Sequence, residues 1–172
     1  MTINTARITA QITARQTSSN PWNAEFTPTV QRVIDLTDGT SANQANILYA
    51  NERAVASASN DDIDLAGSLS DAFGSTITAA EIVAILIINK PKTGSDNTTN
   101  LTIGAGTNPW RGVLGGTSPT IGPIKPGGFV MIGCGGADGI GAVTANTADI
   151  LRVANSSGAS ATYQIVILAR TA

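Results

Sequence analysis

The residues with the clearest chemical potential are three carboxylates that lie close together in the sequence, Asp61, Asp62 and Asp64. Asp62 and Asp64 would share one face of a strand, because side chains alternate along a strand with a period of two. Such a pair could bind Ca²⁺ if backbone carbonyls completed the ligand set. The EF-hand pattern is not matched, since the glutamate at its twelfth position is missing whichever aspartate begins the loop. We therefore predict a solvated strand face that discourages edge-to-edge pairing, and no metal site.

A glycine-rich stretch at residues 133–141 resembles a phosphate-binding loop at first sight. The dinucleotide-binding pattern G-x-G-x-x-G requires a third glycine where this chain has Asp138, and a helix should follow. No helix-forming run follows, so we expect a flexible loop that binds neither phosphate nor cofactor. Cys134 lies in this stretch and is expected to be a small, inert residue. An intermolecular disulfide is the alternative in an oxidising environment.

The composition excludes several classes of function. The 172 residues include no histidine and one cysteine, which rules out a Ser-His-Asp triad, a Cys-His dyad and a Cys-based zinc site. The 10 basic residues are outnumbered by 12 acidic ones, whereas nucleic-acid affinity depends on basic side chains. The longest apolar run, residues 82–88, is far too short to span a membrane, and the first twenty residues lack the apolar core of a secretory signal. We therefore expect a non-enzymatic protein without cofactors that binds neither nucleic acid nor membrane.

Short extended segments separated by turn residues account for most of the chain. Alternating or continuous apolar patterns predict strands at residues 30–36, 47–57, 62–65, 82–88, 101–103, 129–132, 149–154 and 161–169. Many short strands with regular turns are typical of an all-β fold, so we predict a jelly-roll-like antiparallel β-sandwich. Residues 78–81 fit a capping box and predict one short helical turn before the apolar run.

The N-terminal segment has the most regular pattern. From Arg7 to Arg15 the residues alternate, with Ile8 and Ile12 on an apolar face and the two arginines on the opposite face. A turn-rich linker with two prolines follows. We therefore divide the chain into an N-terminal strand or arm with its linker, residues 1–28, and a β-sandwich domain, residues 29–172. The pattern fits both a first strand of the body and an extended arm that adds to a neighbouring sheet.

Seven residues are our candidates for contact with a partner protein. They belong to the alternating segment, to the linker after it, or to a later Asn-Pro-Trp sequence that repeats one in the linker. Tryptophan is enriched among the residues that dominate interface energies, although each tryptophan could instead fold back over the edge of the core. The candidates are Arg7, Ile8, Ile12, Arg15, Trp22, Phe26 and Trp110.

Five stretches resemble small β-rich structural proteins of tailed bacteriophages: residues 62–74, 76–84, 125–130, 147–155 and 162–168. The resemblance extends over roughly residues 30–170, so the N-terminal segment lies outside it. It implies a virion component, such as a capsid decoration (cement) protein or a small tail-associated domain. It also implies a jelly-roll or related sandwich, often trimeric, and offers no catalytic residues to carry over.

The resulting expectation is a decoration protein on the outer capsid surface that bridges and stabilises capsid subunits. It would be made in the cytoplasm of a bacterial host, and its partners would be the major capsid protein and other copies of itself in a homotrimer. The alternative is a tail- or fibre-associated β-domain that binds a receptor or glycan, with Trp110 and Tyr163 stacking on sugar rings. An aromatic content of 4% weighs against that alternative.

Overall fold

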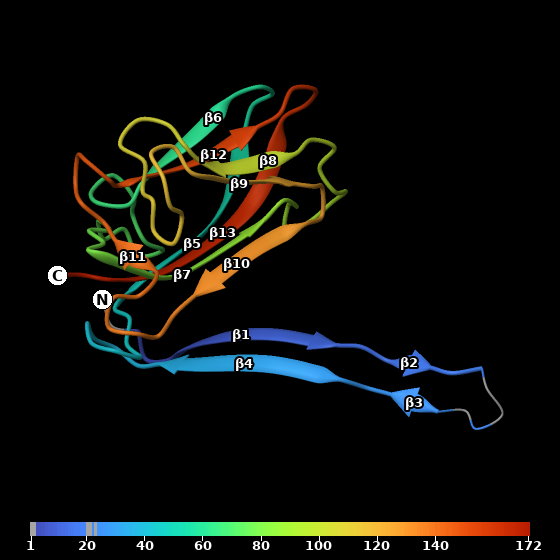
Figure 1. Ribbon diagram of the computed structural model, residues 1–172. Coiled ribbons are helices and arrows are strands. Elements are labelled where there is room, and N and C mark those ends of the chain that lie inside the picture. Colours follow the sequence, from blue (N-terminus) through green and yellow to red (C-terminus); the bar gives the residue numbers. More distant parts are fainter. Residues whose placement is uncertain (1–2, 20–21, 23) are drawn as a thin grey trace.

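The computed structural model describes residues 3–19, 22 and 24–172. The regular elements of these residues are all β-strands (Figure 1). They are β1 (Ala6–Thr13), β2 (Gln16–Thr17), β3 (Glu25–Phe26), β4 (Thr29–Leu36), β5 (Ile47–Val55), β6 (Asn60–Asp64), β7 (Glu81–Ile88), β8 (Leu101–Gly104), β9 (Thr120–Ile124), β10 (Phe129–Gly133), β11 (Gly141–Ala142), β12 (Ile150–Asn155) and β13 (Ala161–Arg170).

Nine of these strands, eight longer ones and the short β11, form two antiparallel sheets, which make up the body of the protein. One sheet has the order β10-β7-β13-β5, with the short β11 added to β7, and the other has the order β6-β12-β8-β9. Among the eight longer strands, the first pairs with the last, the second with the seventh, the third with the sixth and the fourth with the fifth. This nested pairing is the strand order of a jelly roll, so the predicted fold class is confirmed.

The core lies between the two sheets. Ile85 and Ile87 of β7 meet Leu151 and Val153 of β12 in one cluster of buried side chains. The apolar run predicted to be a strand, residues 82–88, forms most of β7, which lies between β10 and β13. Its continuous apolar character has a physical reason, because alternate residues enter the core while the others lie on the opposite face of the sheet.

The N-terminal fifth of the chain forms a long hairpin beside the body. β1 pairs with β4, and the same register continues into β2 and β3. In Figure 1 the hairpin runs beneath the β10-β7 side of the body and extends well beyond it. We call residues 6–36 the arm. The arm includes residues on both sides of the expected boundary between positions 28 and 29, and the division into two domains stays a prediction.

One predicted element is wrong. The helical turn at residues 78–81 is not formed, and no helix that could span a membrane is found in the described part of the chain. The backbone amides there donate to distant strands: Ala79 N–H to Leu65 and Ala80 N–H to Arg170. Glu81 pairs with Arg170 in the sheet. Long-range pairing therefore replaces the local bonds that a capping box offers.

Candidate functional site

The two faces of the arm differ in character. Directly opposed residues of an antiparallel pair share a face, so the pairs Ile8–Ile34 and Ile12–Val30 lie on the same side. Phe26 continues this side because the register does not shift. The members of this face, which we call the apolar arm face, are Ala6, Ile8, Ala10, Ile12, Ala14, Gln16, Phe26, Pro28, Val30, Arg32, Ile34 and Leu36.

The base of the arm packs on the body. Leu36 is buried in a second, smaller core cluster with Val83 and Leu168, and Ile8 and Ile34 pack against that cluster. These contacts lie on the outer face of the β10-β7-β13-β5 sheet. They account for the apolar side chain at Ile8, on one side of the alternating segment.

The outer part of the arm is uncovered. Ile12, Phe26 and Val30 are each at least 64% exposed, although all three are large and apolar. A two-stranded hairpin is at best marginally stable by itself in water, and this part extends about 30 Å beyond Ile8 at the rise of a β-strand. Trp22, another predicted contact residue, is also strongly exposed near the tip. Ile12 and Phe26, two of the predicted contact residues, therefore lie along one protruding surface, whereas Ile8 packs on the body.

The two predicted arginines lie on the opposite face of the arm. Arg7 Nε is 2.6 Å from Asp35 Oδ1, and Arg15 Nη2 is 2.7 Å from Glu25 Oε2. The hydrogen bond with Asp35 raises the pKa of Arg7, and hydrogen bonds from Arg15 and Thr27 lower the pKa of Glu25. Both arginines are thus paired within the hairpin, where they join its two strands.

A second apolar surface lies on the body, on the outer face of the β10-β7-β13-β5 sheet. The register places three rows of side chains across this face. We call them the outer sheet face: Phe129, Ile88, Gln164 and Glu52; Met131, Leu86, Val166 and Ala50; and Gly133, Ala84, Leu168 and Leu48. Only the last row meets the base of the arm, through Ala84 and Leu168.

A groove of about 440 Å³ runs between the arm and this sheet. Its lining combines residues of the arm with residues of the middle and last rows, and Arg7 is its only charged member. The lining residues are Arg7, Ile8, Thr9, Ala84, Ile85, Leu86, Met131, Val166 and Leu168. Ile8 of the apolar arm face therefore meets the outer sheet face along this groove, and Arg7 and Thr9 of the opposite arm face also line it.

Trp110 does not belong to this surface. Its side chain is 4% exposed and lies in the main core cluster, so its proposed role as a partner contact is not compatible with the structure. A Cβ on Gly112 would lie 2.2 Å from the Trp110 ring, which shows how closely the backbone covers it. The interpretation of Trp110 as a side chain folded over the core is the one that holds.

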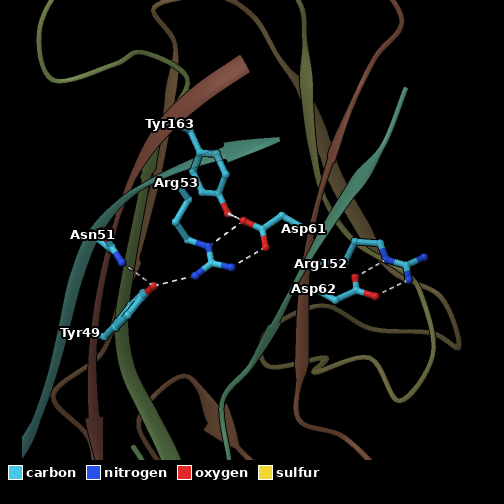
Figure 2. A network of polar contacts seen from close by, with 7 residues as sticks. All are labelled: Tyr49, Asn51, Arg53, Asp61, Asp62, Arg152 and Tyr163. Carbon is cyan, nitrogen blue, oxygen red and sulfur yellow. Dashed lines mark hydrogen bonds and ion pairs between the residues drawn. The ribbon is translucent and has the colours of Figure 1, made fainter. Parts of the chain in front are cut away.

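Two of the three clustered carboxylates, those of Asp61 and Asp62, form ion pairs, and Asp64 accepts a hydrogen bond from the Ala66 N–H. Figure 2 shows Asp61 facing Arg53, with Arg53 Nε 2.6 Å from Asp61 Oδ2 and Arg53 Nη2 2.5 Å from Asp61 Oδ1. Tyr163 Oη donates to the same Oδ2 at 2.7 Å, and Arg53 Nη1 donates to Tyr49 Oη at 3.0 Å. We call these four residues the edge clasp. They connect β5 and β13 of one sheet with β6 of the other, so they hold the sandwich closed along that edge.

The charges in the clasp stabilise one another. Burial raises the pKa of Asp61, but hydrogen bonds from Arg53 and Tyr163 outweigh burial, and the resulting pKa lies below the ordinary value. Burial and the bond to Asp61 raise the pKa of Tyr163. Asp62 points away from the clasp and pairs with Arg152, whose hydrogen bonds lower its pKa (Figure 2). In the described part of the chain no group of three acidic, cysteine or histidine residues is placed to hold a metal.

The glycine-rich stretch is a loop between β10 and β11, and it is anchored to the body. The guanidinium of Arg170 is fully buried and donates to the carbonyls of Gly136 and Ala137 at 2.9 and 2.6 Å. The same side chain forms an ion pair with Glu81. Cys134 is exposed, so it does not fill space in the core. Local sequence patterns do not predict this anchor, because its donor lies 33 residues further along the chain.

The sequence predicts the strands of both surfaces, but it does not predict that β4 pairs with β1 or that one face of the β10-β7-β13-β5 sheet is an apolar surface. Val30 was recognised as part of a strand, but its pairing with Ile12 depends on the 29–36 segment folding back onto the N-terminal one. Phe129, Met131 and Leu86 were recognised as strand residues, and the signal available for their role was that β7 is apolar at every position after Glu81.

Comparisons with known proteins do not indicate a function for this surface. Comparison of the chain with protein-family models, with curated proteins and with solved structures found no match.

Proposed function

We propose that the chain is a non-enzymatic structural protein of a virus particle, most specifically a capsid decoration protein that bridges and stabilises capsid subunits. It acts from the outer capsid surface after synthesis in the cytoplasm of a bacterial host. Its partners are the major capsid protein and other copies of itself. Homotrimer formation stays a prediction of the resemblance to phage structural proteins.

The observation that carries this proposal is the protruding arm with its uncovered apolar face. Ile12, Phe26 and Val30 hold large apolar side chains in water, a state that association with another surface would relieve. Large exposed apolar patches on a folded protein mark interaction sites. A molecule whose most prominent feature is an attachment arm is suited to assembly.

Two further features support a structural role. The body has the jelly-roll strand order, an architecture that many capsid proteins use, although this analogy concerns the fold alone. The edge clasp is the polar network with the strongest pKa shifts, and its charged groups are paired with one another. Its groups therefore stabilise the fold and do not resemble a site prepared for catalysis.

The glycan-binding alternative loses its proposed contacts. Trp110 and Tyr163, the aromatics expected to stack on sugars, are both buried in the core. Stacking on a sugar requires an accessible ring face, so neither residue can serve without unfolding. The alternative remains as an outcome of the test below.

The direct test is immunogold electron microscopy of virus particles from the bacterial host that carries this gene, with an antibody against the purified protein. We expect label over the whole head. Label confined to the tail would replace the decoration role with the tail-associated one. Particles that carry no label, while the antibody detects the protein in the same lysate, would overturn the proposal of a virion component.

A second test asks whether the protein strengthens the shell. Capsids that lack the protein are heated with and without added purified protein, and DNA release is followed with an intercalating dye. A decoration protein should raise the release temperature, because binding to the assembled lattice alone stabilises that state by mass action. An unchanged release temperature at saturating protein would contradict the bridging role.

A further inference from the structure

We infer that the uncovered half of the arm and the outer sheet face are the two halves of one interface between copies of this chain. The outer arm of one copy packs over the β10-β7-β13-β5 sheet of a second copy. This inference rests on the self-association expected in the proposed function, but it does not depend on any capsid.

The proposed interface continues a contact that the arm already makes with its own body. The apolar arm face packs on the outer sheet face at the base of the arm, where Ile8 and Ile34 meet Ala84 and Leu168. The same face of the arm continues outward through Ile12 and Val30 with no change of register. In Figure 1 the outer end of the hairpin, with β2 and β3, extends beyond the body, and Ile12 and Val30 are 75% and 73% exposed, so a sheet of another molecule can supply the equivalent contact further out.

The outer sheet face is apolar but only partly covered. The row Met131, Leu86 and Val166 is half-buried, and Phe129 at the end of the next row is 67% exposed. The outer face of an antiparallel sheet is ordinarily polar when it faces water. An apolar outer face, open along a groove beside the arm, is the surface expected of a layer that another element covers.

The apolar arm face and the outer sheet face carry few charges, and these are of opposite sign. The apolar arm face contains one charged residue, Arg32, which has no ion-pair partner among the described residues. The three rows of the outer sheet face also contain one, Glu52, which is of opposite sign. Arg7 and Arg15 are already paired inside the arm. Two nearly neutral surfaces with single opposite charges suit each other better than they suit a highly charged partner.

The solvent-accessible surface area of the chain exceeds that of a compact monomer of the same mass. A compact monomer of 17.4 kDa exposes about 7,900 Å² by the scaling of surface with mass, whereas this chain exposes 9331 Å². The excess of about 1,400 Å² is enough for a standard interface, which takes about 800 Å² from each partner. Each copy has one arm to give and one sheet face to receive an arm. Such contacts close either by reciprocal exchange in a dimer or around a ring.

The first experiment measures the oligomeric state of the purified protein by sedimentation velocity over a range of concentrations. The variant Ile12→Thr with Val30→Thr removes two apolar contacts and keeps β-branched side chains, so the hairpin retains its strand propensity. Its control, Gln11→Thr with Gln31→Thr, changes the directly opposed pair on the other face of the same hairpin. We expect the wild type and the control to associate, and the apolar-face variant to associate at least tenfold more weakly.

The second experiment identifies what the arm touches. The photoreactive p-benzoylphenylalanine replaces Phe26, and cross-linked dimers are separated on a denaturing gel and mapped by mass spectrometry. We expect links between position 26 and peptides of the outer sheet face that contain Leu86, Met131 or Val166. A complementary variant, Val166→Thr, should weaken association while the melting temperature verifies that the protein stays folded.

Three results would overturn the inference. The first is a wild type that is monomeric at all concentrations measured. The second is an apolar-face variant that associates as strongly as its control. The third is a set of cross-links that map only from arm to arm. A protein that associates through the sheet but labels no virion would keep this inference and overturn the decoration role. A monomer that labels the head through its arm would do the reverse.

Discussion

Ile12 and Val30 lie directly opposite each other in the arm, and their side chains are 75% and 73% exposed. Four residues closer to the base, the equivalent position is filled by Ile8, which packs with Ile34 on the body. The same pair of strands therefore presents one covered and one uncovered apolar pair. This difference is the physical basis for regarding the outer arm as an attachment element.

Shortening the arm should separate attachment from folding. Replacing residues 11–31 with Asn-Gly joins the directly paired residues Ala10 and Arg32 by a short turn and keeps Ile8, Ile34 and Leu36 in place. We expect loss of self-association and a change in unfolding free energy of no more than about 1 kcal/mol, since no residue that the structure describes as buried is removed. Urea denaturation and sedimentation velocity measure the two effects.

Deleting residues 1–28 is the informative contrast. That change leaves β4 without its partner strand and uncovers Leu36 and Val83, which the base of the arm helps to bury. We expect a markedly lower melting temperature for this deletion than for the shortened arm. Equal stability of the two proteins would show that the base of the arm contributes nothing to the body.

The edge clasp should contribute more to stability than the neighbouring ion pair. Asp61→Asn leaves the half-buried guanidinium of Arg53 without its counter-ion, and we expect a loss of about 2–3 kcal/mol of unfolding free energy. Asp62→Asn breaks the more exposed pair with Arg152 and should cost less than about 1 kcal/mol. Equal effects of the two substitutions in urea denaturation would contradict the clasp.

The clasp also predicts a dependence of stability on pH. The pKa of Asp61 is lower in the folded protein than in the unfolded chain, so its ionised form favours folding. This contribution is fully present above the unfolded-state pKa of about 4, and it is lost as the pH falls through the lower folded-state pKa. The stability difference between the wild type and Asp61→Asn should therefore shrink below about pH 4. A difference that stays constant down to pH 2 would contradict the assignment.

Gly112 should be sensitive to a single methyl group. Its φ of +46° disfavours other residues, and a Cβ would lie 2.2 Å from the Trp110 ring. We expect Gly112→Ala to reduce the unfolding free energy by about 1–3 kcal/mol through overpacking. Gly115→Ala, at a nearby position with open space around it, should change it by less than about 0.5 kcal/mol. Denaturation followed by tryptophan fluorescence compares the two.

Local patterns predicted the strands well where one residue's neighbours in sequence decide its environment. The expected strand at residues 161–169 is β13, and the expected run at 82–88 is most of β7. β9 was missed because Gly122 and Pro123, residues that ordinarily interrupt strands, lie inside it. The helical turn at 78–81 was wrong because the backbone bonds of these residues go to distant strands.

The candidate site was only partly accessible to the same reasoning. The alternation of residues 7–15 predicts that Ile8 and Ile12 share one apolar face, because a period of two is a property of the local sequence. The sequence could not decide which face would be covered, since that depends on the body beneath the arm. It also could not place Asp61 beside Arg53, because their charges meet across the edges of two different sheets.

The two Asn-Pro-Trp sequences mark this boundary most clearly. The tryptophans of these identical tripeptides differ in exposure: Trp22 is 86% exposed on the arm, and Trp110 is buried in the core. The sequence by itself determined the all-β class, most strand positions and the apolar stripe, because alternation and turn residues act over a few neighbours. Only the tertiary structure decided which apolar residues remain in water, because burial depends on surfaces brought together from distant parts of the chain.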